Sequence, residues 1–584
     1  NYSMSSGKES DESLMKSEDR EVEFIGSNQA LAIDPDKVLI AFGTFGRYQI
    51  LNCMMVVAPL FLYASTIMVM PFLTEEDVEF TCAIQPGYKR MFEVVDSCTV
   101  RETLSGLKHS CLSLIGTATA FNYGNASVDA TLVSAFNLVC EDSSKRDHIS
   151  ATYLFGSMCG ASIFSQLSDK LGRKKTFLIS LWMALCSSIL LVWVPNYYLF
   201  IVFQFLSGVG MGGNIAIGYC MCNEVVSPSM REYTPFITNF FWIAGYVWAG
   251  VARMKFVSWT SVYMAAVAPG LFSLVYTCTF PESLHWMVTN RKTNLIRKYI
   301  HTATRVNGMA GIDLHECRSA RHLSDQDLDS VGISPLATIL RNWKVCYQFA
   351  VAATLMAVMN MTYWALSLFS KDLSDDKTTG FFLSALVEIP AAVISVILLK
   401  LMNRRPVSCL MFILTSFCLL ATAYIPAYLS GESAKAAALI LPLLAKMFNS
   451  IVWAVLPLAM SEMIPTVIRN SFTGGVSFIG DVGSVVSPYL ELLNTFGPNT
   501  AALLITWLSA GCALLVMTMP ETKGSHLGAG METFNEGEFV KMIVRTCGGE
   551  EKQDDDDDDT KYIPNGQLNT IEEESNTSKA TFSV

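Results

Sequence analysis

The chain has 584 residues, of which 51% are hydrophobic and only 16% are charged. This composition excludes an ordinary soluble globular protein and favours a chain whose main solvent is the lipid bilayer. The formal net charge of −11 is concentrated near the chain ends, notably in the run from Asp554 to Asp559. The charge balance therefore gives no support to nucleic-acid binding.

Apolar runs of membrane length recur along the chain. A hydrocarbon core about 30 Å thick requires roughly 20 apolar residues per helix, and about twelve runs reach that length. An even number of spans places both termini on one side of the membrane. The expected spans are residues 50–72, 147–168, 176–194, 197–221, 234–254, 260–280, 346–369, 378–400, 406–428, 434–460, 471–492 and 499–519.

Polar segments divide these spans into two groups. The N-terminal segment lacks a basic stretch followed by an apolar one, so we expect no cleavable signal peptide. The C-terminal segment is strongly acidic, which is typical of a disordered tail. The expected regions are a mostly disordered tail at 1–45, a first bundle at 46–280 with a large loop at 73–146, a linker at 281–345, a second bundle at 346–522 and a disordered acidic tail at 523–584.

Basic residues in the short loops predict the orientation. Lys and Arg gather on the cytosolic side of membrane proteins. They follow the second span at Lys170, Arg173, Lys174 and Lys175, and the eighth span at Lys400, Arg404 and Arg405. We therefore expect both termini and the linker in the cytosol, although Arg253 and Lys255 on the opposite side count against the rule.

The large loop after the first span would then be extracellular. It contains a glycosylation sequon at Asn125 and four cysteines, Cys82, Cys98, Cys111 and Cys140. An oxidising compartment favours disulfides between these cysteines, and four cysteines allow three pairings. The alternative is that they remain free thiols.

Charged motifs recur in the same order in both halves of the chain. Arg173 is followed by Glu224 and Arg231, and Arg404 is followed by Glu462 and Arg469 with the same Glu-to-Arg spacing. Pro281-Glu282-Ser283 likewise recurs as Pro520-Glu521-Thr522. These repeats predict a tandem duplication whose unit is a bundle of spans.

Three ionisable residues lie well inside expected spans: Glu388, Lys446 and Asp481. Ionisable groups within a membrane are costly and by default mark a transport path. The alternative is that Asp481 neutralises Lys446 in a buried structural pair.

Other motifs do not indicate catalysis or cofactor binding. Gly208, Gly210 and Gly213 match G-x-G-x-x-G, but they lie inside an apolar span and follow no strand. Gly208 and Gly212 instead predict a close contact between helices. The aspartate run of the tail is interpreted as solvated charge and not as a metal site. No nucleophile, base and orienting group cluster outside the lipid, so we expect no enzyme, no cofactor and no ATP site.

Several stretches resemble known transporters. The segment S-Q-L-S-D-K-L-G-R-K-K, from Ser165 to Lys175, is similar to the loop motif of the major facilitator superfamily. The stretches F-G-R-Y-Q, F-N-L-V-C-E-D, P-E-S-L-H-W, S-E-M-I-P-T-V-I-R-N and P-E-T-K-G resemble the organic cation, organic anion and carnitine transporter family, over about residues 43–527. Ser165 and Asn403 depart from glycines of the loop motif. The resemblance implies an all-α polytopic fold with twelve transmembrane helices in two pseudo-symmetric six-helix bundles.

The repeated charges are predicted to gate the carrier. Gly172 suits a tight turn, and Asp169 ends a helix where the dipole is already negative, so it requires a cationic or helix N-terminal partner. The resemblance implies that this partner is the start of the eleventh span near Asn470. The alternative role is a simple topology anchor. The predicted gating residues are Asp169, Gly172, Arg173, Glu224, Arg231, Arg404, Glu462 and Arg469.

The resemblance also implies a substrate site. Cation transporters of the family carry Asp at the place of Asp481, whereas its anion and carnitine relatives carry Arg. Ala454 stands where cation transporters carry Glu, which would remove one carboxylate. Aromatic faces attract ammonium groups. The predicted substrate-binding residues are Asp481, Glu388, Lys446, Tyr219, Trp242, Tyr246, Tyr363 and Trp364.

Together these features predict a polyspecific plasma-membrane carrier of small organic cations that works by alternating access. A first alternative is a carrier of carnitine-like zwitterions or organic anions, in which Lys446 would hold the carboxylate. A second alternative, of another class, is a transport-inactive sensor or partner-binding protein that uses the long loop or the acidic tail.

Overall fold

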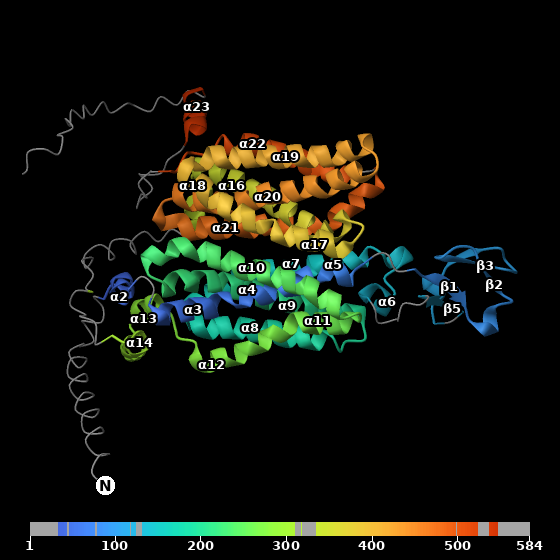
Figure 1. Cartoon of the computed structure of the whole chain (residues 1–584), viewed down its shortest axis with the longest axis horizontal. Coiled ribbons are helices and arrows are strands. Elements are labelled where there is room, and N and C mark those ends of the chain that lie inside the picture. The colour runs from blue at the N-terminus through green and yellow to red at the C-terminus, as the bar shows by residue number, and fades with distance from the viewer. Residues whose placement is uncertain are drawn as a thin grey trace, which may run out of the picture. The chain divides into compact units, whose positions relative to one another are not determined.

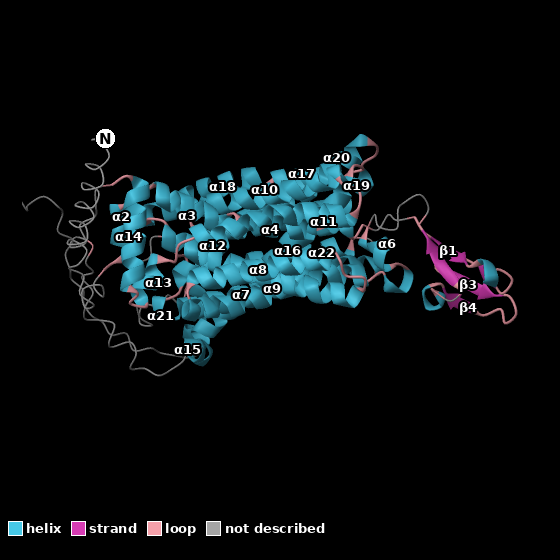
Figure 2. Ribbon diagram, turned by 90° about the horizontal axis from the view of Figure 1, so that it is seen from below, coloured by secondary structure: helices cyan, strands magenta, loops and turns pink. Residues whose placement is uncertain are grey.

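Long helices fill the expected spans. The computed structural model describes residues 33–43, 46–75, 79–116, 118–123, 131–309, 317, 335–497, 499–523 and 537–546. The chain divides into two compact units, residues 1–538 and 539–584. The membrane-length helices all belong to the first unit, where they run side by side in two groups (Figures 1 and 2). We call residues 47–279 the N-half and residues 343–516 the C-half.

The N-half contains the first six expected spans. Its elements are α3 (Arg47–Val57), α4 (Pro59–Met68), α5 (Met70–Leu73), α6 (Leu132–Phe136), α7 (Lys145–Leu171), α8 (Arg173–Leu191), α9 (Tyr197–Val225), α10 (Thr234–Lys255), α11 (Trp259–Val267), the 3-10 helix η6 (Ala268–Val275) and α12 (Tyr276–Thr279).

The C-half contains the other six. Its elements are α16 (Trp343–Leu368), η7 (Phe369–Leu373), α17 (Lys377–Leu386), α18 (Glu388–Leu401), α19 (Arg404–Tyr428), α20 (Glu432–Met463), α21 (Thr466–Val486), η8 (Ser487–Thr495) and α22 (Thr500–Val516).

Within the described residues, eight helical segments are long and apolar enough to cross a membrane. The remaining expected spans are occupied by α7, α10, the α11-to-α12 segment and α22. Prolines explain why some spans are interrupted, because a proline clashes with the carbonyl four residues earlier. Pro390 follows the last residue of α17, Leu386, by four positions, and Pro59 begins α4. The predicted all-helical architecture is thus confirmed for the membrane-length segments.

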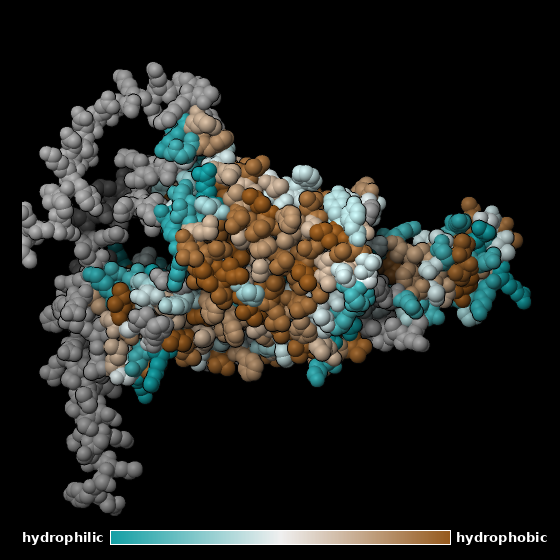
Figure 3. Space-filling model, turned by 45° about the horizontal axis from the view of Figure 1, so that its top comes forward, coloured by the Kyte–Doolittle hydropathy of each residue, from teal (hydrophilic) through white to brown (hydrophobic). Residues whose placement is uncertain are grey.

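The outer surface matches a bilayer environment. Figure 3 shows a broad hydrophobic band between two hydrophilic ends. Large apolar side chains such as Phe240, Phe417 and Trp507 are exposed on the membrane-length helices. This arrangement leaves apolar surface for lipid and polar surface for water.

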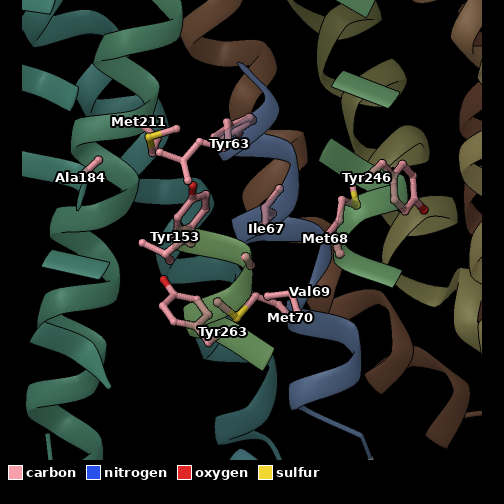
Figure 4. Packing of buried hydrophobic residues seen from close by; sticks show 14 of the residues in the cluster. Tyr63, Ile67, Met68, Val69, Met70, Tyr153, Ala184, Met211, Tyr246 and Tyr263 are labelled. Carbon is pink, nitrogen blue, oxygen red and sulfur yellow. The ribbon is translucent and has the colours of Figure 1, made fainter. Parts of the chain in front are cut away.

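The N-half core contains several buried tyrosines. Figure 4 shows Tyr63 and Ile67 of α4 on the side of Tyr153, whereas Tyr246 lies on the other side of α4, beyond Met68. The Tyr153 hydroxyl lies 2.9 Å from the Thr66 hydroxyl, so this buried polar group has a partner. A buried hydroxyl needs a hydrogen-bond partner of this kind where no water can supply one.

The glycines of α9 allow a close approach to α7. A Cβ atom on Gly208 would lie 2.2 Å from the backbone oxygen of Tyr153, and one on Gly212 would lie 2.0 Å from that of Ser157. No side chain larger than hydrogen fits at these distances. The glycines therefore act as predicted, as packing positions between helices.

A group of short helices lies at the end where the basic loops are found. These are α2 (Pro35–Ala41), α13 (Leu284–Thr289) and α14 (Thr293–Asn307). They share a buried cluster with the start of α3, in which the rings of Tyr48 and Tyr299 are 5.4 Å apart. We call this the basic-loop end. Two further helices are α15 (Pro335–Arg341) and α23 (Glu538–Thr546), whose first residue is the last of the first unit.

The large loop forms a small β-module, residues 79–123, at the opposite end of the helices (Figure 2). Strand β1 (Thr81–Ile84) pairs antiparallel with β5 (Thr119–Asn122). A second antiparallel sheet has the order β2 (Phe92–Val94), β3 (Thr99–Glu102), β4 (Lys108–Ser110). The predicted disulfides are confirmed, and their pairing is Cys82–Cys111 and Cys98–Cys140. The second disulfide ties the module to the segment before α7.

We expect Gly212→Ala to destabilise the protein, because the added methyl group would force α7 and α9 apart. Overpacking of this kind costs about 1–3 kcal/mol. Gly511→Ala is the matched control, since a Cβ atom there meets nothing within 4 Å. Thermal unfolding of the purified variants in detergent measures the effect. Equal melting temperatures for the two variants would contradict this account of helix packing.

Candidate functional site

The two halves meet at a buried chain of polar contacts. The indole nitrogen of Trp242 on α10 donates to the Tyr363 hydroxyl on α16 over 2.8 Å. That hydroxyl donates to Glu388 Oε1 over 2.7 Å, and Glu388 lies 3.1 Å from the ammonium of Lys446 on α20. We call Trp242, Tyr246, Tyr363, Ser384, Glu388 and Lys446 the central network.

Aromatic faces and hydroxyls surround the Lys446 ammonium. It donates to Ser384 Oγ over 2.8 Å and lies 4.5 Å from the ring centre of Tyr246 and 5.4 Å from that of Tyr363. Lys446 and Glu388 are only 1% and 3% exposed. A buried ion is tolerated when it is paired and its hydrogen-bonding positions are filled. Both conditions hold for Lys446, whose charge is cancelled by Glu388.

Tyr246 links this network to the N-half. Its hydroxyl lies 3.1 Å from Ser384 Oγ and 3.2 Å from Ser370 Oγ, both on the C-half. Its ring packs on Phe381 with centroids 4.6 Å apart. Tyr246 is fully buried, so α10 cannot leave the C-half without uncovering these groups.

Four aromatic rings from both halves form a layer beside the network. Tyr63 and Trp242 come from the N-half, and Tyr363 and Trp364 come from the C-half. The centroid of Trp242 lies 5.7 Å from that of Tyr63 and 6.1 Å from that of Trp364. Tyr363 lies 5.8 Å from Trp364. We call these four rings the aromatic layer.

Asp481 on α21 lies next to this layer. Asn360 of α16 donates to Asp481 Oδ1 over 3.3 Å, and Trp453 of α20 donates to the Asn360 oxygen over 3.1 Å. The carboxylate also interacts electrostatically with the hydroxyl of Tyr63 on the N-half. Among the described residues, no Lys or Arg pairs with Asp481. Lys446 pairs with Glu388 and not with Asp481.

The predicted aromatic residues do not all meet. The structure brings Trp242, Tyr246, Tyr363 and Trp364 together, whereas Tyr219 lies on α9 and is 59% exposed. Sequence reasoning missed Tyr63, Trp453 and Asn360. Asn360 could have been found in the sequence, because it is an amide inside an apolar run. Nothing in the sequence distinguishes Tyr63 and Trp453 from the other aromatic residues.

At the basic-loop end, each half makes the same set of charged contacts. Arg173 lies 3.2 Å from Glu224, and Arg404 lies 3.3 Å from Glu462. Glu282 accepts from the backbone nitrogen of Lys174 over 2.9 Å, as Glu521 does from that of Arg405 over 3.2 Å. None of these contacts joins the N-half to the C-half.

The other predicted gating residues have local partners as well. Asp169 lies 2.5 Å from Arg173, and 68% of its side chain is exposed. Among the described residues, no hydrogen bond or ion pair joins it to the start of α21, where its partner was expected. Arg231 pairs with Asp36 at 2.5 Å, and Arg469 donates to the Ile464 carbonyl over 3.0 Å. Gly172 has a φ of 104°, the conformation expected of a turn glycine.

At the β-module end, contacts join the halves. Glu75, which follows α5, lies 2.5 Å from Lys377 of the C-half and 3.5 Å from Arg253 of the N-half. His148 and Tyr489 add a hydrogen bond of 2.9 Å across the same interface. Arg253 was one of the two residues, with Lys255, that opposed the predicted orientation, and its pairing with Glu75 explains why it is tolerated there.

Two further expectations concern bound groups. The sequon at Asn125 lies outside the described residues, as does the aspartate run of the tail. No cluster of three or more His, Cys, Asp or Glu in the described part of the chain could hold a metal ion.

We expect Glu388→Gln to lower stability by about 3–5 kcal/mol, because it leaves the Lys446 ammonium buried without a counter-charge. The double variant Glu388→Gln/Lys446→Gln should recover most of that loss. A double-mutant cycle of melting temperatures in detergent measures the coupling. Additive effects of the two single substitutions would show that the pair is not coupled.

Comparisons with known proteins agree with this architecture. The sugar (and other) transporter family matches residues 108–534. The organic cation transporter protein of Drosophila melanogaster is 25% identical, covering 72% of this chain and 76% of its own. The human organic cation/carnitine transporter 2 is 26% identical over 68% of this chain and 70% of its own.

Comparison with a solved structure supports the fold but says nothing about the substrate. The inward-open xylose transporter XylE from E. coli aligns with a TM-score of 0.54 at 14% identity, covering 82% of this chain and 98% of that one. The predicted resemblance to organic cation and carnitine transporters is confirmed, and the members of this family are transporters and not enzymes. The chain belongs to the sugar (and other) transporter family of the major facilitator superfamily and is a multi-pass membrane transporter of small molecules.

Proposed function

We propose that the protein is a plasma-membrane carrier of small organic cations. The observation that carries this proposal is the charge of the centre. Glu388 and Lys446 cancel each other at 3.1 Å, whereas Asp481 has no paired cation among the described residues. The described residues of the centre therefore hold one carboxyl group more than they hold cations, and a solute with one positive charge would neutralise that group in its ionised form.

The surroundings of Asp481 strengthen the preference for a cation. A carboxylate acts more strongly on a charge where water is scarce than it does in bulk water. The aromatic layer offers ring faces, which attract ammonium groups at short range. Two relatives are named for organic cations, in agreement with this chemistry.

The proposed mechanism is alternating access. The basic-loop end faces the cytosol and the β-module faces the exterior, with both termini cytosolic. The aromatic layer, the central network and Glu75 then close the outer side, while the charged contacts of the inner side stay within their own halves. Opening to the exterior requires α10 to part from α16 and α17, which breaks the contacts of Trp242 and Tyr246.

Transport of a monocation needs no coupling ion. Moving one charge across the membrane potential supplies about 2.3 kcal/mol per 100 mV. A carnitine-like zwitterion is the second candidate, and one relative is named for carnitine. Against it, the Lys446 ammonium already pairs with Glu388, which leaves less positive charge for a substrate carboxylate.

We expect Asp481→Asn to reduce uptake of radiolabelled tetraethylammonium by about ten- to a hundredfold. The reason is the loss of a charge-assisted contact worth about 1.5–3 kcal/mol. Asp375→Asn removes an exposed carboxylate elsewhere, which pairs with Lys435, and should leave uptake unchanged.

Cation uptake that survives Asp481→Asn would remove Asp481 from the site. A wild-type protein that takes up carnitine but not tetraethylammonium would favour the zwitterion carrier. A surface-expressed protein that takes up neither these nor p-aminohippurate would favour a sensor.

We expect Glu75→Gln to shift the carrier toward its outward-open state, because it removes the anion between Arg253 and Lys377. Partly exposed ion pairs are worth up to about 1 kcal/mol, so the shift should be about fivefold. The readout is the labelling rate of Ser370→Cys by an impermeant maleimide, since Ser370 is fully buried here. Asp375→Asn, whose Lys435 partner lies in the same half, is the control. An unchanged labelling rate in Glu75→Gln would show that this carboxylate does not hold the outer side closed.

A further inference from the structure

The environment of Lys446 has the composition of a binding site for an organic cation. A carboxylate lies 3.1 Å from the ammonium, a hydroxyl accepts from it over 2.8 Å, and two tyrosine ring centres lie 4.5 Å and 5.4 Å away. Carboxylates and ring faces are the groups that bind free ammonium ligands in proteins. The cation in this site belongs to the chain itself.

This site lies between the halves and not within the core of one half. Lys446, Glu388, Ser384 and Tyr363 all belong to the C-half, whereas Tyr246 comes from α10 of the N-half. When α10 withdraws, the four C-half groups remain together and lose their cover. A solute that enters from the exterior would then meet the Lys446 ammonium next to Glu388.

The Lys446 site is close to Asp481. Tyr363 contacts Glu388, and Asn360 contacts Asp481. These two residues are three positions apart on α16, which places them on neighbouring parts of one helix face, about 4.5 Å apart along the axis. The two carboxylates therefore flank a single turn of the same helix, and only one of them is neutralised by the chain.

We infer that Lys446 is a specificity-determining residue that fills a second cation subsite around Glu388 and restricts the carrier to solutes with one positive charge. This inference rests on the proposed function and deepens it. With Lys446 present, Asp481 is the one carboxylate among the described residues of the centre that no cation of the chain pairs with. Without it, two carboxylates would face the solute, and a solute with two ammonium groups would satisfy both.

The test compares a monocation with a dication in proteoliposomes that contain the purified full-length carrier. The probes are radiolabelled tetraethylammonium and radiolabelled putrescine, with the membrane potential clamped at zero so that driving forces are equal. We expect Lys446→Gln to raise the ratio of putrescine to tetraethylammonium uptake at least tenfold over wild type. An unchanged ratio would overturn the inference.

Two matched variants separate the subsite from a general loosening of the protein. Lys446→Arg keeps a cation beside Glu388 and should keep the wild-type ratio. Lys446→Gln/Glu388→Gln removes both charges and should return the ratio to near the wild-type value. A raised ratio in this double variant would show that the effect does not come from Glu388, and would overturn the inference.

A binding measurement covers the case in which Lys446→Gln folds but does not transport. Putrescine should then raise its melting temperature in detergent more than tetraethylammonium does, with the opposite order in wild type. The same order in both proteins contradicts the inference. Failure of wild type to take up tetraethylammonium would instead refute the proposed function, so the two claims fail on different results.

Discussion

Lys446 and Glu388, 3.1 Å apart and almost without exposure to solvent, impose the main constraint on this structure. Two ions removed from water are stable only when each is paired and its remaining hydrogen-bonding positions are filled. Ser384, Tyr363 and the ring of Tyr246 meet that requirement. Because Tyr246 comes from the other half, the same constraint joins α10 to the C-half and closes the centre on one side.

The two ends of the helices are held in different ways. At the basic-loop end, Arg173 and Arg404 each pair with a glutamate of their own half, so these contacts brace each half separately. At the centre Tyr246 reaches across the interface, and at the β-module end Glu75 does so. In the proposed alternating access, contacts of the first kind would hold each half together while the halves rock. Contacts of the second kind would break without unfolding either half.

The sequence predicts how deep in the membrane a residue lies better than it predicts which side of its helix faces a given partner. Apolar length located every span, and the repeated charges predicted a duplication whose two copies make matching contacts. Cysteine placement predicted the disulfides but not their pairing. By contrast, Lys446 had two carboxylates at similar depth, Glu388 and Asp481, and only the helix rotations decide between them. Glu75 was missed because its partners are far away in the chain, and α10 and α17 must pack together before they meet.

The proposed selectivity for a cation depends on Asp481 being the carboxylate that is free to receive a solute. The most direct measurement is a cryo-EM map of the purified carrier with bound tetraethylammonium. We expect ligand density between Asp481 and the rings of the aromatic layer, with the Lys446–Glu388 pair intact beside it. Ligand density against Glu388 with Lys446 displaced, and none near Asp481, would contradict this assignment.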